Sequence, residues 1–195
     1  MKKNQSDIYS RKDYFRKYFE SLERKKGGLK KIKKIGKVLL FGEINDETVA
    51  NTIASLEEAK ELGFKAIDLV ICSEGGFIDY GNALIDYIIH FPLPIITTSY
   101  GCAVSMAAVI FQLGVIRRMT PLSILAIHHS HSAPEGTPEK LKKESKLANY
   151  QDEVLFTLMS LRSKIPLDKL KKIAYPIIYI TPEEAVKMNL ADVII

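Results

Sequence analysis

Three apolar runs, with amphipathic segments between them, constrain the fold of this chain more than any other feature. The runs are VLLF (38–41), AIDLVIC (66–72) and PIITTSY (94–100). The intervening segments, 45–63 and 79–91, have apolar residues at the spacing of a helix that buries one face. Strands that alternate with helices of about ten residues or more require crossover connections. The sequence therefore predicts an α/β fold with a largely parallel sheet.

Capping residues and apolar spacing predict the remaining elements. A helix is expected over 11–26, and we expect it to end at the Gly27-Gly28 pair. LSILAIHH (122–129) is strand-like. A long helix is expected after Thr137, which suits an N-cap and is followed by proline at the first helical position. Another helix is expected after Thr181, where the spacing of a capping box is present.

Composition places the chain in a broad class. With 195 residues, 47% hydrophobic and 26% charged, it has the size and balance of a soluble globular domain. Cys72 and Cys102 have no metal-binding or disulfide-framework spacing, which favours a reducing compartment. The first ten residues lack the apolar core of a signal peptide, and the longest apolar stretch is too short to span a bilayer. We expect a cytoplasmic protein without a metal or another cofactor.

Positive charge is concentrated at the N-terminus. Residues 1–37 contain 14 of the 28 lysine and arginine residues and only four acidic residues. A basic arm of this kind can bind nucleic acid or an anionic surface, but no recognised nucleic-acid-binding module surrounds it. We therefore expect a solvated basic extension over 1–37 ahead of a domain over 38–195, and we do not expect nucleic acid as a partner.

Three loops that follow predicted strands carry chemically unusual residues. They are SEGG (73–76), GCAVS (101–105) and HHSHS (128–132). In parallel sheets, binding sites gather in the loops beyond the carboxyl ends of the strands. We therefore expect these three loops to form one site.

The residues of these loops suit nucleophilic catalysis by serine. A serine hydroxyl needs an imidazole within hydrogen-bond reach, and His128 follows Ser105 by 23 residues, at the end of the next predicted strand. The oxyanion of an attacked carbonyl needs backbone N–H donors. Met106, at the start of a predicted helix, and the Gly75-Gly76 pair could supply them, since glycine permits the close approach.

Taken together, VICSEGGFI, GCAVSMAA and LAIHHS resemble the three active-site segments of the Clp protease proteolytic subunit family, ClpP. The resemblance continues through LLFGEINDETVAN and TPEEAVKMNLADVI and covers roughly residues 38–195. It implies the α/β ClpP/crotonase-like fold, in which β-β-α units repeat as a superhelix. It also implies a protruding long helix, the handle, at about residues 132–163.

The resemblance also implies roles for individual residues. Ser105 resembles the nucleophile and His128 the general base of the family. Gly76 and Met106 resemble the donors of the oxyanion hole.

Substrate binding and assembly follow from the same resemblance. The strand Gly76-Phe77-Ile78 and the segment from Ser132 to Gly136 resemble two edges between which an extended polypeptide pairs, which is recognition by strand addition. The family implies a homo-oligomer of two stacked heptameric rings, with a AAA+ unfoldase as partner and no membrane association. No cofactor is implied.

One departure concerns the acid of the catalytic triad. The resemblance aligns Ile177 with that acid, and no aspartate or glutamate occurs from Lys169 to Thr181. In serine proteases, replacing the acid by its amide lowers turnover by about 10⁴. Milder departures are Glu74, where the family usually has proline, and His129-Ser130 in place of glutamine-proline.

Several alternatives follow from the missing acid. Asp168 could fold back to His128, or a backbone carbonyl or water could orient the ring. Lys146 could act as the base, as in ring-forming signal-peptide peptidases, or His129 or His131 could replace His128. The chain could also be a structural subunit with little activity, or an acyl-CoA enzyme of the crotonase type.

Overall fold

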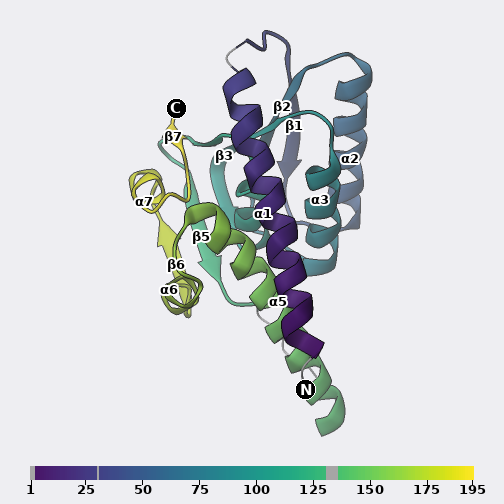
Figure 1. Cartoon of the computed structure of the whole chain (residues 1–195), viewed down its shortest axis with the longest axis vertical. Coiled ribbons are helices and arrows are strands. Elements are labelled where there is room, and N and C mark those ends of the chain that lie inside the picture. The colour runs from purple at the N-terminus through teal and green to yellow at the C-terminus, as the bar shows by residue number, and fades with distance from the viewer. Residues whose placement is uncertain (1–2, 30, 131–135) are drawn as a thin grey trace.

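A seven-stranded sheet is the centre of the fold (Figure 1). The computed structural model of the chain describes residues 3–29, 31–130 and 136–195. In chain order the elements are α1 (Lys3–Leu29), β1 (Ile35–Phe41), α2 (Asp46–Glu61), β2 (Ala66–Ser73), α3 (Ile78–His90), β3 (Ile95–Val104), α4 (Met106–Phe111), β4 (Arg117–Met119), β5 (Ile124–His128), α5 (Pro138–Ser163), α6 (Leu167–Ile173), β6 (Ile177–Ile180), α7 (Pro182–Lys187) and β7 (Val193–Ile194).

The sheet is parallel except at one edge, as the alternation of strands and helices predicts. Its main order is β1-β2-β3-β4-β7, and all of these neighbours are parallel. β3 pairs with β4 through Thr97–Ser99 and with β5 through Cys102–Val104, so one long strand supports two neighbours. β6 then adds to β5 in the antiparallel direction.

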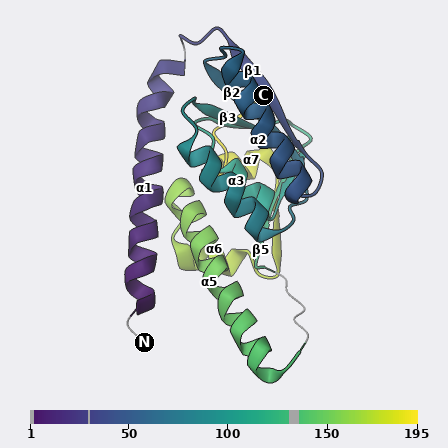
Figure 2. The ribbon, with the colours of Figure 1, turned by 90° about the vertical axis from the view of Figure 1, so that its right-hand side faces the viewer.

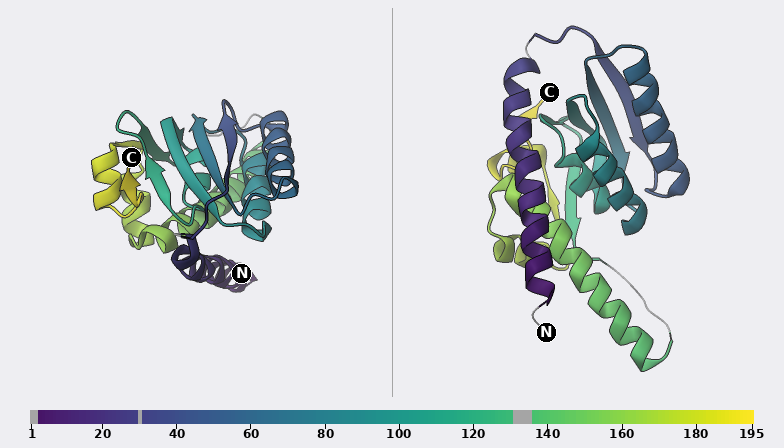
Figure 3. Two further views of the ribbon diagram at one scale, coloured as in Figure 1. Left: turned by 90° about the horizontal axis from the view of Figure 1, so that it is seen from above. Right: turned by 45° about the vertical axis from the view of Figure 1, so that its right-hand side comes forward.

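Burial explains the different sequence patterns of β1 and β2. β2 is covered on both faces, and its residues form a nearly continuous apolar run. β1 is an edge strand with alternating exposed and buried residues. Helix α2 packs on β1 and lies beside α3 (Figure 3), and α4 contacts both the sheet and α5.

Helix α1 is longer than the sequence predicted. It continues through Gly27 and Gly28 to Leu29, so the predicted end at the glycine pair is wrong. Each glycine in a helix costs about 1 kcal/mol relative to alanine, but Leu29 is buried and anchors the last turn. The face of α1 that carries Phe15 and Phe19 is buried in the same core as the sheet. The division of the chain at residue 37 stays a prediction.

Helix α5 leaves the body of the protein and forms the protruding handle (Figure 2). It begins after Thr137, whose side chain accepts a hydrogen bond from the N–H of Lys140 at 3.3 Å, as the capping residues predicted. Its first half is largely exposed, whereas Phe156–Met159 are buried. The predicted handle began at about residue 132, but residues 131–135 lie outside the described ranges.

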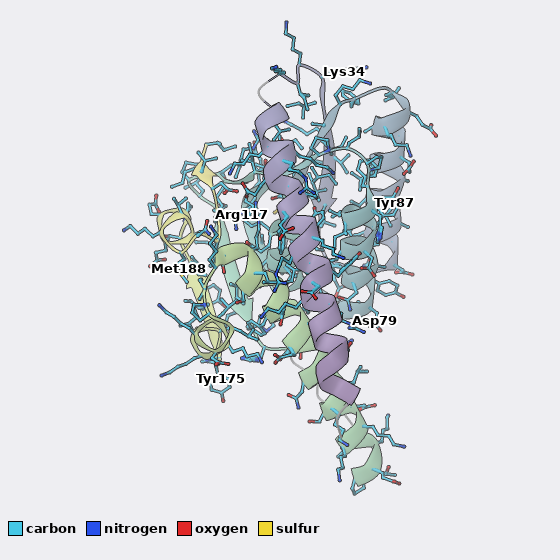
Figure 4. The ribbon with its side chains drawn as sticks, viewed as in Figure 1. Lys34, Asp79, Tyr87, Arg117, Tyr175 and Met188 are labelled. Carbon is cyan, nitrogen blue, oxygen red and sulfur yellow. The ribbon has the colours of Figure 1, made fainter. Side chains whose placement is uncertain are left out.

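The carboxyl-terminal segment is locked onto the sheet by a buried arginine. Arg117, labelled in Figure 4, is 1% exposed and donates to Asp192 through Nε at 3.0 Å and to Gln112 at 2.7 Å. Burial acts to raise the pKa of Asp192, but the hydrogen bonds and charge of Arg117 outweigh it and hold that pKa below its usual range. β7 is thereby held beside β4.

Candidate active site

One pocket of about 160 Å³ brings together residues from all three of the predicted site loops. It lies where β2, β3 and β5 end and where α5 passes the sheet. The predicted nucleophile, base and oxyanion donors all line it, and so does one carboxylate that the sequence analysis did not single out. The residues that line the pocket include Gly76, Ile78, Ser105, Met106, His128 and Asp152.

Ser105 stands on a strained turn between β3 and α4. Its φ is 57° and its ψ is −124°, a conformation that costs about 1–3 kcal/mol for a residue other than glycine. Its N–H donates to the carbonyl of Ala126 at 2.9 Å, which ties the turn to β5. A strand-to-helix turn with a strained serine is typical of a nucleophile whose hydroxyl is exposed to substrate.

The glycine pair after β2 lies against this turn. Gly75 has φ 99°, and a Cβ on it would lie 2.7 Å from the Cβ of Ser105. Gly76 forms a bridge with Ile44, and a Cβ there would lie 2.4 Å from the carbonyl oxygen of Ile44. Both positions therefore require glycine, because they combine an unusual φ or a close backbone approach with no room for a side chain.

Two backbone donors are placed beside the serine. Met106 is the first residue of α4, so its N–H has no acceptor within the helix. Gly76 lines the same pocket from the opposite loop. This arrangement suits the stabilisation of an oxyanion formed on a carbonyl that Ser105 attacks.

His128 ends β5 and lines the pocket beside Ser105. Its Nδ1 lies 2.5 Å from the carbonyl oxygen of His129. A carbonyl can only accept a hydrogen bond, so Nδ1 carries the proton. In the neutral ring Nε2 is then unprotonated, which is the form that a general base requires.

Ile177 occupies the position directly opposite His128. The two residues pair across the antiparallel strands β5 and β6, and side chains of directly opposite residues lie on the same face of a sheet. The residue that the sequence aligned with the acid of a triad therefore does stand beside the base, and it is apolar.

Asp152, on α5, is the carboxylate that the sequence analysis missed. Its Oδ1 accepts from the N–H of Ser130 at 3.0 Å, and its Oδ2 lies 3.0 Å from Nδ1 of His129. The other ring nitrogen of His129 lies 3.0 Å from the carbonyl oxygen of Lys171. Nothing in the local sequence separates Asp152 from the other charged residues of the handle, so only its contacts with the segment after β5 identify it.

None of the alternative bases and acids that lie in the described ranges lines the pocket. Both ring nitrogens of His129 face acceptors, and His129 is not among the residues that line the pocket, so it is not available as a base. Lys146 and Asp168 are exposed and do not line the pocket either. His131 lies outside the described ranges.

The predicted substrate-binding residues in the described ranges do not all line the pocket. The predicted strand Gly76-Phe77-Ile78 is wrong: Gly76 forms one bridge, Phe77 is the N-cap of α3, and Ile78 begins that helix. Ile78 lines the pocket, whereas Phe77 is 58% exposed and packs edge-to-face with Tyr80. Gly136 is exposed before α5 and does not line the pocket. Ser132 lies outside the described ranges.

The described part of the chain has neither a cluster of metal-binding side chains nor a membrane-spanning helix. No group of three or more histidine, cysteine, aspartate or glutamate residues there is placed to hold a metal ion. None of the helices in those ranges is long and apolar enough to cross a membrane.

Comparison with known proteins gives a family match and many similar proteins, one of which is named below. The profile of the Clp protease family matches residues 21–195. The ATP-dependent Clp protease proteolytic subunit 1 of Gloeobacter violaceus (strain ATCC 29082 / PCC 7421) is 25% identical over 165 residues, which are 83% of this chain and 84% of that protein.

Proposed function

The chain belongs to the Clp protease family, and from that premise we propose that it is the proteolytic subunit of an ATP-dependent, Clp-type serine endopeptidase. Ser105 is the nucleophile, His128 the general base, and Gly76 and Met106 the oxyanion donors. The observation that carries the proposal is that these four residues line one pocket, with Ser105 on a strained turn directly before the first residue of α4.

The reaction proceeds by acyl transfer. Nε2 of His128 takes the hydroxyl proton of Ser105 while Oγ bonds to the peptide carbonyl carbon, and the N–H groups of Gly76 and Met106 stabilise the oxyanion. The protonated ring then gives this proton to the leaving amine as the C–N bond breaks, which leaves an ester on the serine. Water, deprotonated by the same nitrogen, attacks the ester, and the serine regains its proton as the acid product leaves.

The substrate is an unfolded polypeptide, bound in extended form by backbone pairing near Gly76 and the segment from Ser132 to Gly136. Such pairing reads the backbone more than the side chains, so selection depends on delivery by a AAA+ unfoldase. The active form is a homo-oligomer of stacked heptameric rings in the cytoplasm, and it needs no cofactor, membrane or nucleic acid.

Labelling with a fluorophosphonate and hydrolysis of a fluorogenic peptide test the proposed activity. Wild-type protein is expected to be labelled on Ser105 and to hydrolyse the peptide, and Ser105→Ala is expected to lose both. Ser55→Ala, a serine on α2 away from the pocket, is the matched control and should behave as wild type. Equal labelling of wild type and Ser105→Ala would contradict the proposal.

A second candidate function rests on Ile177. A subunit with an apolar residue beside its base could have a structural role, with little turnover of its own. This alternative predicts ring assembly without hydrolysis, and it predicts that Ile177→Asp raises turnover from near zero. Robust wild-type hydrolysis that depends on Ser105 would exclude it.

A further inference from the structure

Nδ1 of His128 is hydrogen-bonded to a peptide group. Ile177, the residue opposite it, has no hydrogen-bond acceptor in its side chain. The carbonyl of His129 accepts from Nδ1 of His128 at 2.5 Å instead. The position of the peptide unit between residues 129 and 130 therefore contributes to the orientation of the ring.

Asp152 holds this same peptide unit from its other side. Its Oδ1 accepts from the N–H of Ser130 at 3.0 Å. The unit is planar and trans, so its N–H and C=O point in opposite directions. Anchoring the N–H of Ser130 on the handle helix therefore sets the direction in which the carbonyl of His129 meets the ring of His128.

Asp152 is itself held firmly. Its second oxygen lies 3.0 Å from Nδ1 of His129, whose other nitrogen faces the carbonyl of Lys171 at 3.0 Å. The ring of His129 packs on Phe156 with centroids 4.8 Å apart. The Asp152 side chain is only 15% exposed, and hydrogen bonds to a carboxylate are stronger in such surroundings than in water.

We propose that Asp152 is the positioning residue that replaces the missing acid of the triad, acting through the His129–Ser130 peptide on Nδ1 of His128. This inference rests on the proposed serine peptidase. The carboxylate polarises the peptide, which strengthens its carbonyl as an acceptor. The ring is thereby kept with its proton on Nδ1, which leaves Nε2 to accept the proton of Ser105.

Steady-state peptide hydrolysis by the full chain is the first test. Asp152→Ala is expected to lower kcat by about 10²-fold with little change in KM, because a small misplacement of a catalytic group costs about that much. Asp152→Asn keeps an oxygen for the N–H of Ser130 but loses the charge. Its kcat should therefore lie between those of the wild type and Asp152→Ala. Glu144→Ala is the matched control on the same helix, since the ion pair of Glu144 with Lys140 lies outside this hydrogen-bond network. An equal loss of kcat in Glu144→Ala would overturn the proposal.

Restoring an acid beside His128 distinguishes a positioning role of Asp152 from a general loss of protein stability in Asp152→Ala. Ile177→Asp places a carboxylate directly opposite the base, and in that background Asp152→Ala should have little effect on kcat. Independent sites have additive effects, whereas two groups that serve the same role do not. The same fractional loss from Asp152→Ala in both backgrounds would show a merely structural role and overturn the proposal.

The tautomer of His128 gives a readout that needs no turnover. Solid-state nitrogen NMR of histidine-labelled protein, with His128 assigned by the loss of its signals in His128→Gln, should show Nδ1 protonated in wild type and mixed tautomers in Asp152→Ala. An unchanged tautomer in Asp152→Ala would overturn the inference. If the tautomer responds but no variant, including Ile177→Asp, has Ser105-dependent turnover, the peptidase proposal fails and the positioning role stands.

Discussion

At the scale of single residues, the turn around Ser105 stores strain that the surrounding packing must offset. The cost of its positive φ, about 1–3 kcal/mol, is balanced by the hydrogen bond to Ala126 on β5 and by the fully buried helix α4 that follows. Gly75 completes the turn, because it lets the loop after β2 approach the serine more closely than any side chain would permit.

Gly75→Ala is therefore expected to disable the site. The new Cβ would lie 2.7 Å from that of Ser105 at a φ of 99°, so we predict a loss of fluorophosphonate labelling greater than about tenfold, in addition to the backbone strain of about 1–2 kcal/mol. Gly42→Ala is the matched control, because Gly42 has φ 85° but nothing within 4 Å of an added Cβ. It should lose stability by the strain alone and keep its labelling. Similar labelling in the two variants would contradict this account.

The candidate site could be predicted from sequence only where short motifs carry it. Ser105, Met106 and Gly76 are within a few residues of a strand end, so the order of motifs was enough to bring them together. The role of Asp152 depends on where the handle meets the segment after β5, and no local pattern encodes that contact. Ile177 was aligned correctly beside His128, but the sequence could not say which group takes over its role.

At the scale of elements, most helices and the central strands were predicted because their apolar periodicity reflects burial. The short strands β4 and β7 were missed, since three or two residues carry no periodicity and depend on pairing with their neighbours. The predicted end of α1 at the glycine pair was wrong for a related reason. The burial of Leu29 in the tertiary structure outweighs the low helix propensity of the glycines.

Helix α1 is joined to the rest of the chain by a buried hydrogen bond from Tyr18. Its hydroxyl donates to the carbonyl of Leu113 at 2.8 Å. Burial, the largest cause, raises the pKa of Tyr18 well above the ordinary value of 10.0, although the charge of Arg162 acts in the opposite direction. The folded protein therefore retains the phenol proton at pH values where the unfolded chain releases it.

Tyr18→Phe is expected to change both stability and its dependence on pH. At pH 7 the free energy of unfolding should fall by about 1–2 kcal/mol, because the carbonyl of Leu113 loses its donor in the core. Above pH 10 the unfolded chain binds fewer protons than the folded one, so wild-type stability should fall by up to about 1.4 kcal/mol per pH unit from this group. The free energy of unfolding of Tyr18→Phe should fall less over the same pH range.

Urea unfolding at pH 7 to 11 measures both effects, with Tyr100→Phe, which changes an exposed tyrosine, as control. An unchanged alkaline slope in Tyr18→Phe would contradict the assignment.

At the scale of the whole molecule, the handle has two parts with different partners. The residues of α5 from Val154 to Leu158 pack against the core of their own chain, with Leu158 fully buried. The second half of the apolar face of the handle therefore belongs to the core of its own chain. The first half projects beyond the body, and it carries Leu147, which is 55% exposed (Figure 2).

Leu147 is thus the residue of the handle at which assembly can be tested without disturbing the core. If the handles of stacked rings bury it, Leu147→Asp should lower the mass of the particle from that of fourteen chains of 22.0 kDa toward that of seven. Burial of a leucine stabilises by about 1.5–3 kcal/mol, so the dissociation constant should rise at least about tenfold for each buried copy. Leu147→Met, which conserves volume, should assemble as wild type. Mass photometry measures both variants over a range of concentrations. Because Leu147 does not line the pocket, a variant that keeps its mass but loses turnover would contradict a role in assembly.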